Sequence, residues 1–343
     1  MPSQREIAKA LRISVATVSL ALRGSRLIST RVRDRVLKKA QQMGYRQNAY
    51  VHALMTQVRS GRKICNQGTI ALLVDKCSEE EWFLVKQFQK YHQAVVQRGH
   101  ELGFQVECFF LRAPGMNAER IDAILYARGI QGLIFAPPYL RNGTLSMQWE
   151  RYACLGGSYP WARQDFDFVS TDHAYNVRLA FEELRRLGYA RIGMLLSSSF
   201  MTGVQWGPRW LSGYLEAQYN LPVLNQIPAF QVDPGWTDAC YLRCLKEWYA
   251  KWKPDVMLAL DFIEWLDRAT GLRFPEDCGF AYYDLCPGSS ASGVNENFDI
   301  VGAVAVEQVV AKMARNEYGV PACPKQTLIH GRWVSGTTTR KQG

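Results

Sequence analysis

Basic side chains near the start of the chain have the clearest chemical potential, because they can neutralise the charges of a polyanion. The 343 residues carry a formal net charge of +10. Residues 1–63 hold 14 Lys or Arg against two acids, Glu6 and Asp34, which is a net charge of +12. The rest of the chain therefore sums to −2. A small basic module joined to a near-neutral body predicts a polyanionic partner for the module alone.

The same segment is patterned to fold as short helices. Ser3 and Glu6 form a capping box for a first helix, and Ser14 is placed to cap a second helix over 15–22. Thr30 is expected to cap a third, longer helix. Two short helices with a tight turn, followed by a longer one, are the helix-turn-helix pattern. The residues expected to pack inward are Ile7, Ala8, Leu11, Val18, Ala21, Leu22, Val32, Val36, Leu37, Ala40 and Met43.

Two sequence motifs in this module resemble the headpiece of the lactose-repressor (LacI/GalR) family. The family pattern VS-x-x-TVS-x-x-L-N-G is present as ISVATVSLALRG at 13–24. Its pattern R-x-x-V-x-x-A-x-x-x-GY-x-P-N is present, with changes, at 33–48. The resemblance implies a DNA-binding transcriptional regulator with a helix-turn-helix domain at 1–46 and a hinge helix and linker at 47–63. It places a ligand-binding and dimerisation domain at 64–343.

The resemblance also assigns contacts with DNA. Val15, Ala16 and Leu20 occupy positions that the family uses to read base edges in the major groove. None of the three has a polar group, so apolar contacts with thymine methyls are what they offer, and a thymine-reading half-site is expected. A partly buried core position is the alternative for Leu20. The residues expected to contact phosphates are Ser3, Ser14, Thr17, Ser19 and Arg23.

The segment that follows matches the family's hinge helix, which forms on operator binding and enters the minor groove. Asn48 can cap this helix, and Leu54 matches the hinge leucine that unstacks a central base step. The family's hinge proline is Gln47 here, and its basic hinge position is His52. The first change removes a rigid start and the second weakens a fixed positive charge, so hinge energetics should differ from those of relatives. An inert linker over 46–63 is the alternative.

From Gly68 the chain alternates apolar strands with helices, which predicts doubly wound parallel α/β sheets. No GxGxxG or GxxxxGK[ST] motif follows a strand, so nucleotide chemistry has no motif support. Strands are expected at 69–74, 104–111, 131–136, 191–197, 255–260 and 278–283. Helices are expected at 83–102, 117–128, 174–187, 207–219 and 237–252.

The resemblance implies that this body is a two-lobed effector domain of the periplasmic-binding-protein-like (type I) fold, with ligand held between the lobes. Lobe 1 would comprise about 66–172 and 297–327, and lobe 2 about 173–296 and 328–340. The lobes would be joined by three crossovers. The expected architecture is therefore an all-α helix-turn-helix headpiece with a hinge helix, followed by an α/β two-lobed domain.

Six side chains of the body are candidates for ligand contact. A carboxylate at the end of a strand, such as Asp261 or Asp284, can accept two hydrogen bonds from sugar hydroxyls. Aromatic faces beside carboxylates favour a carbohydrate, although a structural role is the alternative for each residue. Relatives place ring-stacking aromatics where Trp82 and Phe83 stand, and an effector-binding Arg three residues before a G-F/Y pair. Trp210 is at that Arg position here and Arg209 is one residue earlier, so either a turn shift restores the Arg or Trp210 replaces ion pairing with stacking. The six candidates are Trp82, Phe83, Arg209, Trp210, Asp261 and Asp284.

Other functions are weaker interpretations. A hydrolase could use Asp261 with Asp284, or a nucleophile within 197–199, but no GxSxG motif accompanies them, so we expect no enzyme. The nine cysteines are scattered and never spaced CxxC, which favours reduced thiols over a metal site. Neither a cofactor nor a metal is expected. A ligand-independent architectural DNA-binding protein and a regulator that senses a nucleobase or nucleoside are the remaining alternatives.

The expected partners follow from this interpretation. They are a pseudo-palindromic operator in double-stranded DNA, a small effector that is most simply a sugar, and a second copy of the chain. The C-terminal sequence GTTTRKQG lacks a leucine heptad, which favours a homodimer over a tetramer. No apolar run approaches the roughly 20 residues that cross a bilayer, and the N-terminus has no signal-peptide pattern. We therefore expect a cytoplasmic protein without a membrane partner, most simply a repressor.

Overall fold

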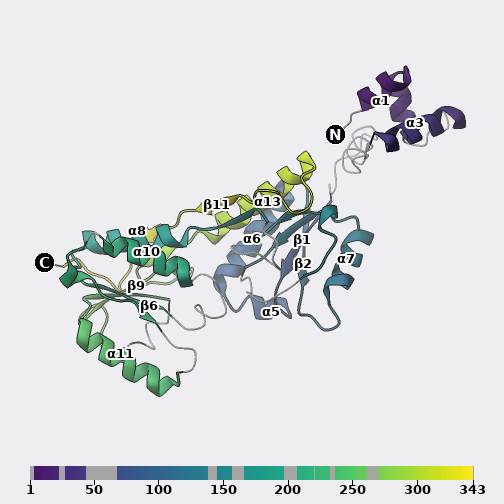
Figure 1. Ribbon diagram of the computed structural model, residues 1–343. Coiled ribbons are helices and arrows are strands. Elements are labelled where there is room, and N and C mark those ends of the chain that lie inside the picture. The colour runs from purple at the N-terminus through teal and green to yellow at the C-terminus, as the bar shows by residue number, and fades with distance from the viewer. Residues whose placement is uncertain are drawn as a thin grey trace. The chain divides into compact units, whose positions relative to one another are not determined.

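The chain divides into two compact units, Met1–Cys65 and Asn66–Gly343. The described residues of the first unit form three helices: α1 (Gln4–Leu11), α2 (Val15–Leu22) and α3 (Thr30–Gln42) (Figure 1). The computed structural model describes residues 4–22, 28–43, 68–137, 145–156, 166–196, 207–219, 221–231, 236–260, 266 and 270–342.

The three helices pack around a small apolar core. Ile7, Val18 and Val36 are fully buried in it, one from each helix, as the helical spacing predicts. The chain turns sharply between α1 and α2 because Arg12 adopts a left-handed conformation with φ of 53°. The amide of Ile13 then donates to the carbonyl of Ala8 at 3.1 Å, which closes the turn. The helix-turn-helix geometry is thus built from local hydrogen bonds and a single apolar cluster.

Two local expectations for α3 are wrong. The cap is Ser29 and not Thr30, because Ser29 has extended backbone angles and its carbonyl accepts from the amides of Val32 and Arg33. Leu37 was expected in the core but is 45% exposed. One residue advances the helix by about 100°, so the side chain after buried Val36 leaves the inward face.

The second unit is built on two mainly parallel sheets. The first has the order β2-β1-β3-β4 and the second β12-β10-β9-β8-β6-β7, in which only β12 is antiparallel to its neighbour among the described pairs. The strands of the first sheet are β1 (Thr69–Val74), β2 (Gln105–Phe110), β3 (Gly132–Phe135) and β4 (Ala153–Leu155). Those of the second are β6 (Ile192–Leu196), β7 (Phe230–Gln231), β8 (Val256–Ala259), β9 (Gly279–Tyr282), β10 (Gly293–Asn295) and β12 (Arg332–Val334).

Helices cover these sheets, which explains why their strands are continuously apolar. Ala71 and Leu73 of β1 pack with Ile121 of α7, whereas Gly132 of β3 faces α13 through Met313. In the second sheet, Met257 and Phe280 pack with residues of α11. The helices of the second unit are α5 (Glu79–Trp82), α6 (Lys86–Glu101), α7 (Ala118–Ala127), α8 (His173–Arg186), α10 (Gly207–Tyr219), α11 (Asp238–Trp252) and α13 (Phe298–Arg315), with 3₁₀ turns η1 (Trp149–Arg151) and η2 (Val223–Asn225).

The helix expected over 83–102 is found as α6 (Lys86–Glu101), and a short helix that was not expected, α5, precedes it. Ser78 accepts from the amide of Glu81 and starts the short α5, which ends at Trp82. A turn then leads to α6, which begins at Lys86. The turn at 83–85 therefore delays the start of the expected helix by three residues.

Two strands outside the main sheets run side by side. β5 (Phe168–Thr171) precedes α8 of the second sheet, and β11 (Gln326–Ile329) precedes β12; the two pair in parallel. A nearly buried ion pair supports them, since Lys312 of α13 donates to Asp167 at 2.6 Å. Asp167 also accepts from the amide of Lys325 at 2.8 Å, so the starts of the two parallel strands are tied to each other and to α13.

None of the helices in the described part of the chain is both long and apolar enough to cross a membrane.

Candidate functional site

Ser14 organises the start of α2. Its Oγ accepts from the amide of Thr17 at 3.0 Å, so Ser14 is the cap that the sequence predicts. The hydroxyl oxygens of Ser14 and Thr17 also lie 2.8 Å apart, so one hydroxyl donates a hydrogen bond to the other. Each hydroxyl has one proton, so the pair keeps one further O–H that can donate to an acceptor such as a phosphate oxygen.

The first residues of α2 form an accessible surface. Ser14 is exposed and Val15 is 42% exposed, while Thr17, Ser19 and Leu20 are half-buried. Leu20 does not belong to the apolar cluster that the three helices bury. Ala16 lies in the same first turn of α2. The helix therefore presents hydroxyl and apolar side chains together, beside the cap.

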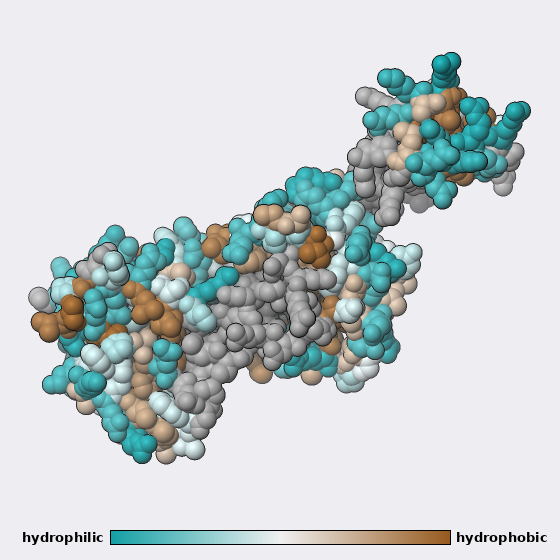
Figure 2. All heavy atoms as spheres, in the orientation of Figure 1, coloured by the Kyte–Doolittle hydropathy of each residue, from teal (hydrophilic) through white to brown (hydrophobic). Residues whose placement is uncertain are grey.

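The first unit also carries exposed basic side chains. Arg12, Arg31, Arg35 and Lys38 are all exposed. Figure 2 shows hydrophilic side chains over most of the visible face of this unit. With only Glu6 and Asp34 as acids in residues 1–63, the surface attracts polyanions over a distance set by ionic screening.

Six of the predicted contact residues lie outside the described residues and stay predictions. Five are expected to contact DNA and one a ligand: Ser3, Arg23, Asn48, His52, Leu54 and Asp261.

In the second unit, polar side chains gather where parallel strands end. Asp284 follows β9 by two residues and Glu296 directly follows β10, so both lie at the carboxyl edge of the second sheet. Gln87 stands in the first turn of α6, in the chain after β1 of the first sheet. Its side-chain amide donates to Asp284 at 3.2 Å, across 197 residues of sequence. This contact brings elements of the two sheets together at the edge where α/β proteins bind ligands.

Glu296 is the centre of a buried polar network. Its Oε1 lies 3.0 Å from Nδ1 of His173 and accepts from the side-chain amide of Asn176 at 3.1 Å. The indole N–H of Trp210 lies 3.5 Å from the same oxygen. His173 and Asn176 begin α8 and Trp210 belongs to α10, so the network joins both helices to the end of β10.

Asp284 is a buried carboxyl with an unusual titration. Burial and the nearby charge of Glu296 raise the pKa of Asp284 well above its usual range, and the bond from Gln87 opposes this only in part. The group remains 8% exposed, whereas Glu296 is 1% exposed. Both carboxyls are buried, and Asp284 is the less buried of the two.

The predicted aromatic and basic ligand contacts have different surroundings. Trp210 is fully buried and lies against Tyr283, the residue before Asp284, with ring centroids 4.7 Å apart. Arg209 lies over the ring of Phe168 at 5.5 Å. Trp82 is fully buried, its ring N–H donates to the carbonyl of Pro137 at 2.6 Å, and it stacks on Phe83. The structure therefore places Trp210 in the network of Glu296, whose charge acts on Asp284, and gives Trp82 and Arg209 partners elsewhere.

Sequence reasoning missed Gln87, His173, Asn176 and Glu296. Glu296 had a usable signal, because it directly follows a short strand as Asp284 nearly does. No feature of the sequence pointed to Gln87, because its partner Asp284 is 197 residues away in the chain. Among the described residues, no group of three or more His, Cys, Asp or Glu side chains is placed to hold a metal ion.

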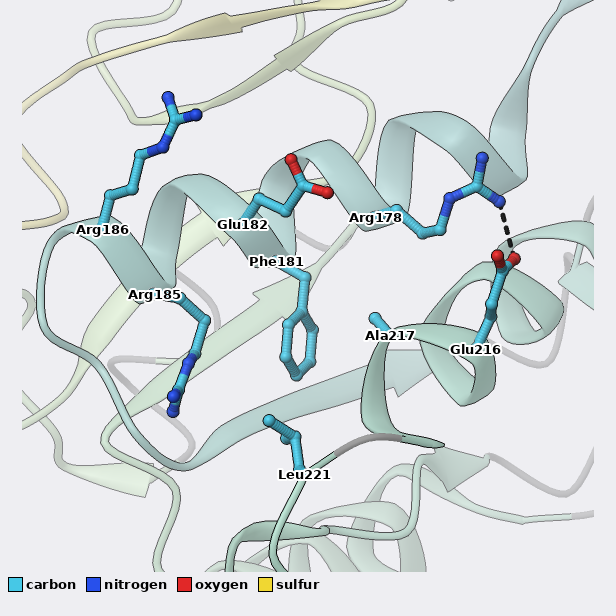
Figure 3. A pocket seen from close by; sticks show the side chains of 8 residues that line it. All are labelled: Arg178, Phe181, Glu182, Arg185, Arg186, Glu216, Ala217 and Leu221. Atoms are coloured by element: carbon cyan, nitrogen blue, oxygen red, sulfur yellow. Dashed lines mark hydrogen bonds and ion pairs between the residues drawn. The ribbon is translucent and has the colours of Figure 1, made fainter.

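A separate surface pocket of about 550 Å³ lies between α8 and α10. Figure 3 shows three arginines projecting from α8 around it, with Phe181 and Leu221 between the helices. Arg178 pairs with Glu216 at 2.7 Å across the pocket. The residues of the Glu296 network do not line it.

Comparison with known proteins agrees with both units. Residues 4–48 match the family described as bacterial regulatory proteins, lacI family. Over 202 residues the chain is 33% identical to the HTH-type transcriptional regulator GalS of Salmonella typhimurium (strain LT2), covering 57% of this chain and 53% of that protein. The chain thus spans about half the length of the curated relative that it matches.

Solved structures share the fold of nearly the whole chain. The transcriptional regulator CelR–cellobiose complex is 18% identical and covers 99% of this chain and 100% of its own, with a TM-score of 0.57. The Lac repressor bound to ONPG in the repressed state is 17% identical, and the match covers 98% of this chain and 99% of the repressor chain, with a TM-score of 0.55. A regulatory protein of the LacI family from Chloroflexus aggregans is 17% identical, covers 79% and 98%, and has a TM-score of 0.57. The fold is that of a helix-turn-helix headpiece with a two-lobed periplasmic-binding-protein-like domain.

Proposed function

We propose that this chain, which belongs to the lacI family of bacterial regulatory proteins, is a DNA-binding transcriptional repressor controlled by a small carbohydrate. A homodimer would present two copies of the first unit to a pseudo-palindromic operator in the cytoplasm. The observation that carries the proposal is the surface of α2. A hydroxyl cap at Ser14 and the apolar side chains of Val15 and Leu20 stand together on a module of charge +12.

Binding of DNA by this surface divides into two parts. Ser14, Thr17 and Ser19, with Ser3 and Arg23, would hold phosphates and fix the position of α2. Val15, Ala16 and Leu20 would then meet base edges, where apolar side chains favour thymine methyls. In the hinge, Asn48, His52 and Leu54 would enter the minor groove. The operator is therefore expected to contain thymine at the positions that face these three side chains. A polar residue at the same place in α2 would select another base.

Ligand control is supported by the carboxyl-edge cluster of the second unit. Asp284 can accept hydrogen bonds from a sugar, and Trp210 lies against the preceding residue, Tyr283. Trp82, Phe83, Arg209 and Asp261 remain further candidate contacts. One structural neighbour is a complex with cellobiose, which is a carbohydrate. A ligand that changes the arrangement at 46–60 needs a coupling of only about 1–3 kcal/mol to switch operator occupancy.

Selection of operators from random DNA by the full chain tests the DNA-reading proposal. We expect half-sites with thymine at the α2 positions, and Leu20→Gln should move that preference towards adenine by about 1–3 kcal/mol, because an amide can pair with adenine N6 and N7. Leu37→Gln, at an exposed leucine of α3, is the matched control and should leave the preference unchanged. Half-sites fixed by guanine at those positions, and indifferent to Leu20→Gln, would contradict the proposal.

A further inference from the structure

Asp284 and Glu296 place two acidic groups close together inside the second unit. Asp284 is 8% exposed and Glu296 is 1% exposed, and each follows a strand of the same sheet. A buried carboxylate is stable only when a cation or several hydrogen-bond donors compensate it. The partners of both groups therefore decide what a molecule at this site must supply.

Those partners leave the cluster incomplete. Oε1 of Glu296 takes the contacts from His173, Asn176 and Trp210, while its buried Oε2 has no hydrogen-bond partner among the described residues. Asp284 accepts at Oδ1 from Gln87, and no other described residue donates to it. A neutral amide from Gln87 offsets only part of a buried negative charge.

The charged groups around Asp284 do not neutralise it. Lys86 of α6 is exposed and faces the Cys286 thiol in the loop after β9. His173 of α8 is bonded to Glu296, and Arg209 of α10 lies over Phe168. No ion pair of Asp284 with a cation occurs among the described residues. Glu296 instead adds a second negative charge behind it.

We propose that the effector carries a positively charged amino group, that Asp284 binds this group directly, and that Glu296 attracts it from behind. The class of ligand is an amine-bearing sugar. The inference rests on the proposed function, because it specifies the effector of the same site. A sugar hydroxyl would satisfy one hydrogen bond of Asp284, whereas an ammonium group supplies up to three donors and the missing charge.

Binding in this form moves a proton. In the free protein below its raised pKa, Asp284 holds a proton; when an ammonium group binds, that proton passes to the solvent and the carboxylate pairs with the cation. The affinity should therefore rise as pH increases through the pKa of Asp284. It should fall again once the amine of the ligand loses its own proton.

Matched sugars test the proposal on the full chain. Calorimetry would compare glucosamine, glucose and N-acetylglucosamine, and the corresponding galactose set. We expect the amino sugar of one set to bind about tenfold or more tightly than the parent sugar and the N-acetyl sugar of that set. Neither of these neutral sugars can form the charged hydrogen bond with Asp284. Asp284→Asn should remove most of that preference, while Glu216→Gln, at an exposed acid of α10, should keep it.

The outcomes separate the two proposals. Equal or tighter binding of neutral sugars, an equal loss for all ligands in Asp284→Asn, or no binding by either set would each overturn the amine proposal. Carbohydrate control of operator binding would still stand if a neutral sugar released the operator. It would fail separately if no sugar altered operator binding at all.

A measurement without ligand tests the premise. A group whose folded pKa is raised stabilises the fold at low pH, and that stability is lost as pH rises through the folded pKa. Asp284→Asn should therefore raise Tm relative to the original chain at pH 8, with the gain shrinking towards pH 4. The same Tm difference at both pH values would show that Asp284 carries no uncompensated charge and would overturn the proposal.

Discussion

Ser14 serves both the fold and the surface of the first unit. Its oxygen caps α2 through the amide of Thr17, and its hydroxyl forms a pair with the hydroxyl of Thr17. The cap could be predicted from sequence because it depends only on residues three positions apart. The remaining O–H of the pair is a consequence of geometry, since it requires the two hydroxyls to lie 2.8 Å from each other.

Substitution of Ser14 separates these two roles. Ser14→Ala should destabilise α2 by about 1 kcal/mol through the lost cap and should also weaken DNA binding. Ser14→Asp keeps an acceptor for the cap but repels phosphates, so it should retain helix stability and lose DNA affinity for every sequence. Amide hydrogen exchange within α2 and DNA binding at fixed salt would measure the two effects. Equal DNA affinity for Ser14→Asp and the original chain would contradict a phosphate contact at this position.

The buried acids show the limit of prediction at the residue scale. Asp284 could be singled out because it follows an apolar strand at a point where ligands bind. The raised pKa of Asp284 could not be predicted from the sequence. It depends on burial and on the charge of Glu296, which follows a different strand. Trp82 and Trp210 show a second limit, since their places in the sequence favoured ligand contact and tertiary packing buried both side chains completely.

At the scale of elements, α8 and α10 form the closest helix contact of the second sheet. A Cβ on Gly213 of α10 would lie 2.4 Å from the carbonyl oxygen of Ala174 and 2.8 Å from its Cα. Backbone atoms cannot move aside as a flexible side chain can. The absence of a side chain at Gly213 therefore sets the distance between the helices that carry His173 and Trp210.

Gly213→Ala should force α10 away from α8. We expect a loss of about 1–3 kcal/mol in the free energy of unfolding, typical of overpacking, and a weaker response to effector because Trp210 moves relative to His173. Ser212→Ala, at the exposed neighbour on the same helix, should change stability by no more than about 0.5 kcal/mol. Denaturant unfolding of both variants would check this, and equal stabilities would show that the helices can separate at no cost.

The strands and most helices of the second unit could be predicted from their apolar pattern. The helix over 207–219 is found at Gly207–Tyr219, and β1 at Thr69–Val74, as expected. The short α5 was not predicted, because it depends on a single side-chain cap at Ser78 and is too short to show a periodic pattern. Periodicity reports which face is buried, but a turn depends on a few specific hydrogen bonds.

At the scale of the whole molecule, charge is divided between the two units. Nearly all of the positive excess lies in residues 1–63, so electrostatic attraction to a polyanion belongs to the first unit. The second unit uses its buried acids locally, near Asp284 and Glu296. The two units differ in the range of their interactions. Exposed charges of the first unit act over about 8 Å in physiological salt, whereas hydrogen bonds of the second unit act only at contact.

Salt dependence should report this division. The logarithm of the operator association constant should fall with the logarithm of salt concentration, by about 0.9 for each phosphate contact. If Arg35 or Lys38 contacts a phosphate, the double change Arg35→Gln with Lys38→Gln should reduce the slope by about one per contact. Lys246→Gln, in α11 of the second unit, should leave the slope unchanged. An unaltered slope in the double variant would place the phosphate contacts on other residues.

The sequence by itself determined the helix-turn-helix, the doubly wound sheets and the segregation of charge, because caps, apolar periodicity and composition are local properties of the chain. It also singled out Asp284 and Trp210 by their places in that pattern. Only the tertiary structure decided that Gln87 meets Asp284 and that His173, Asn176 and Trp210 meet on Glu296. These contacts join residues 86 to 197 positions apart, and burial of the resulting cluster sets the chemistry of the site.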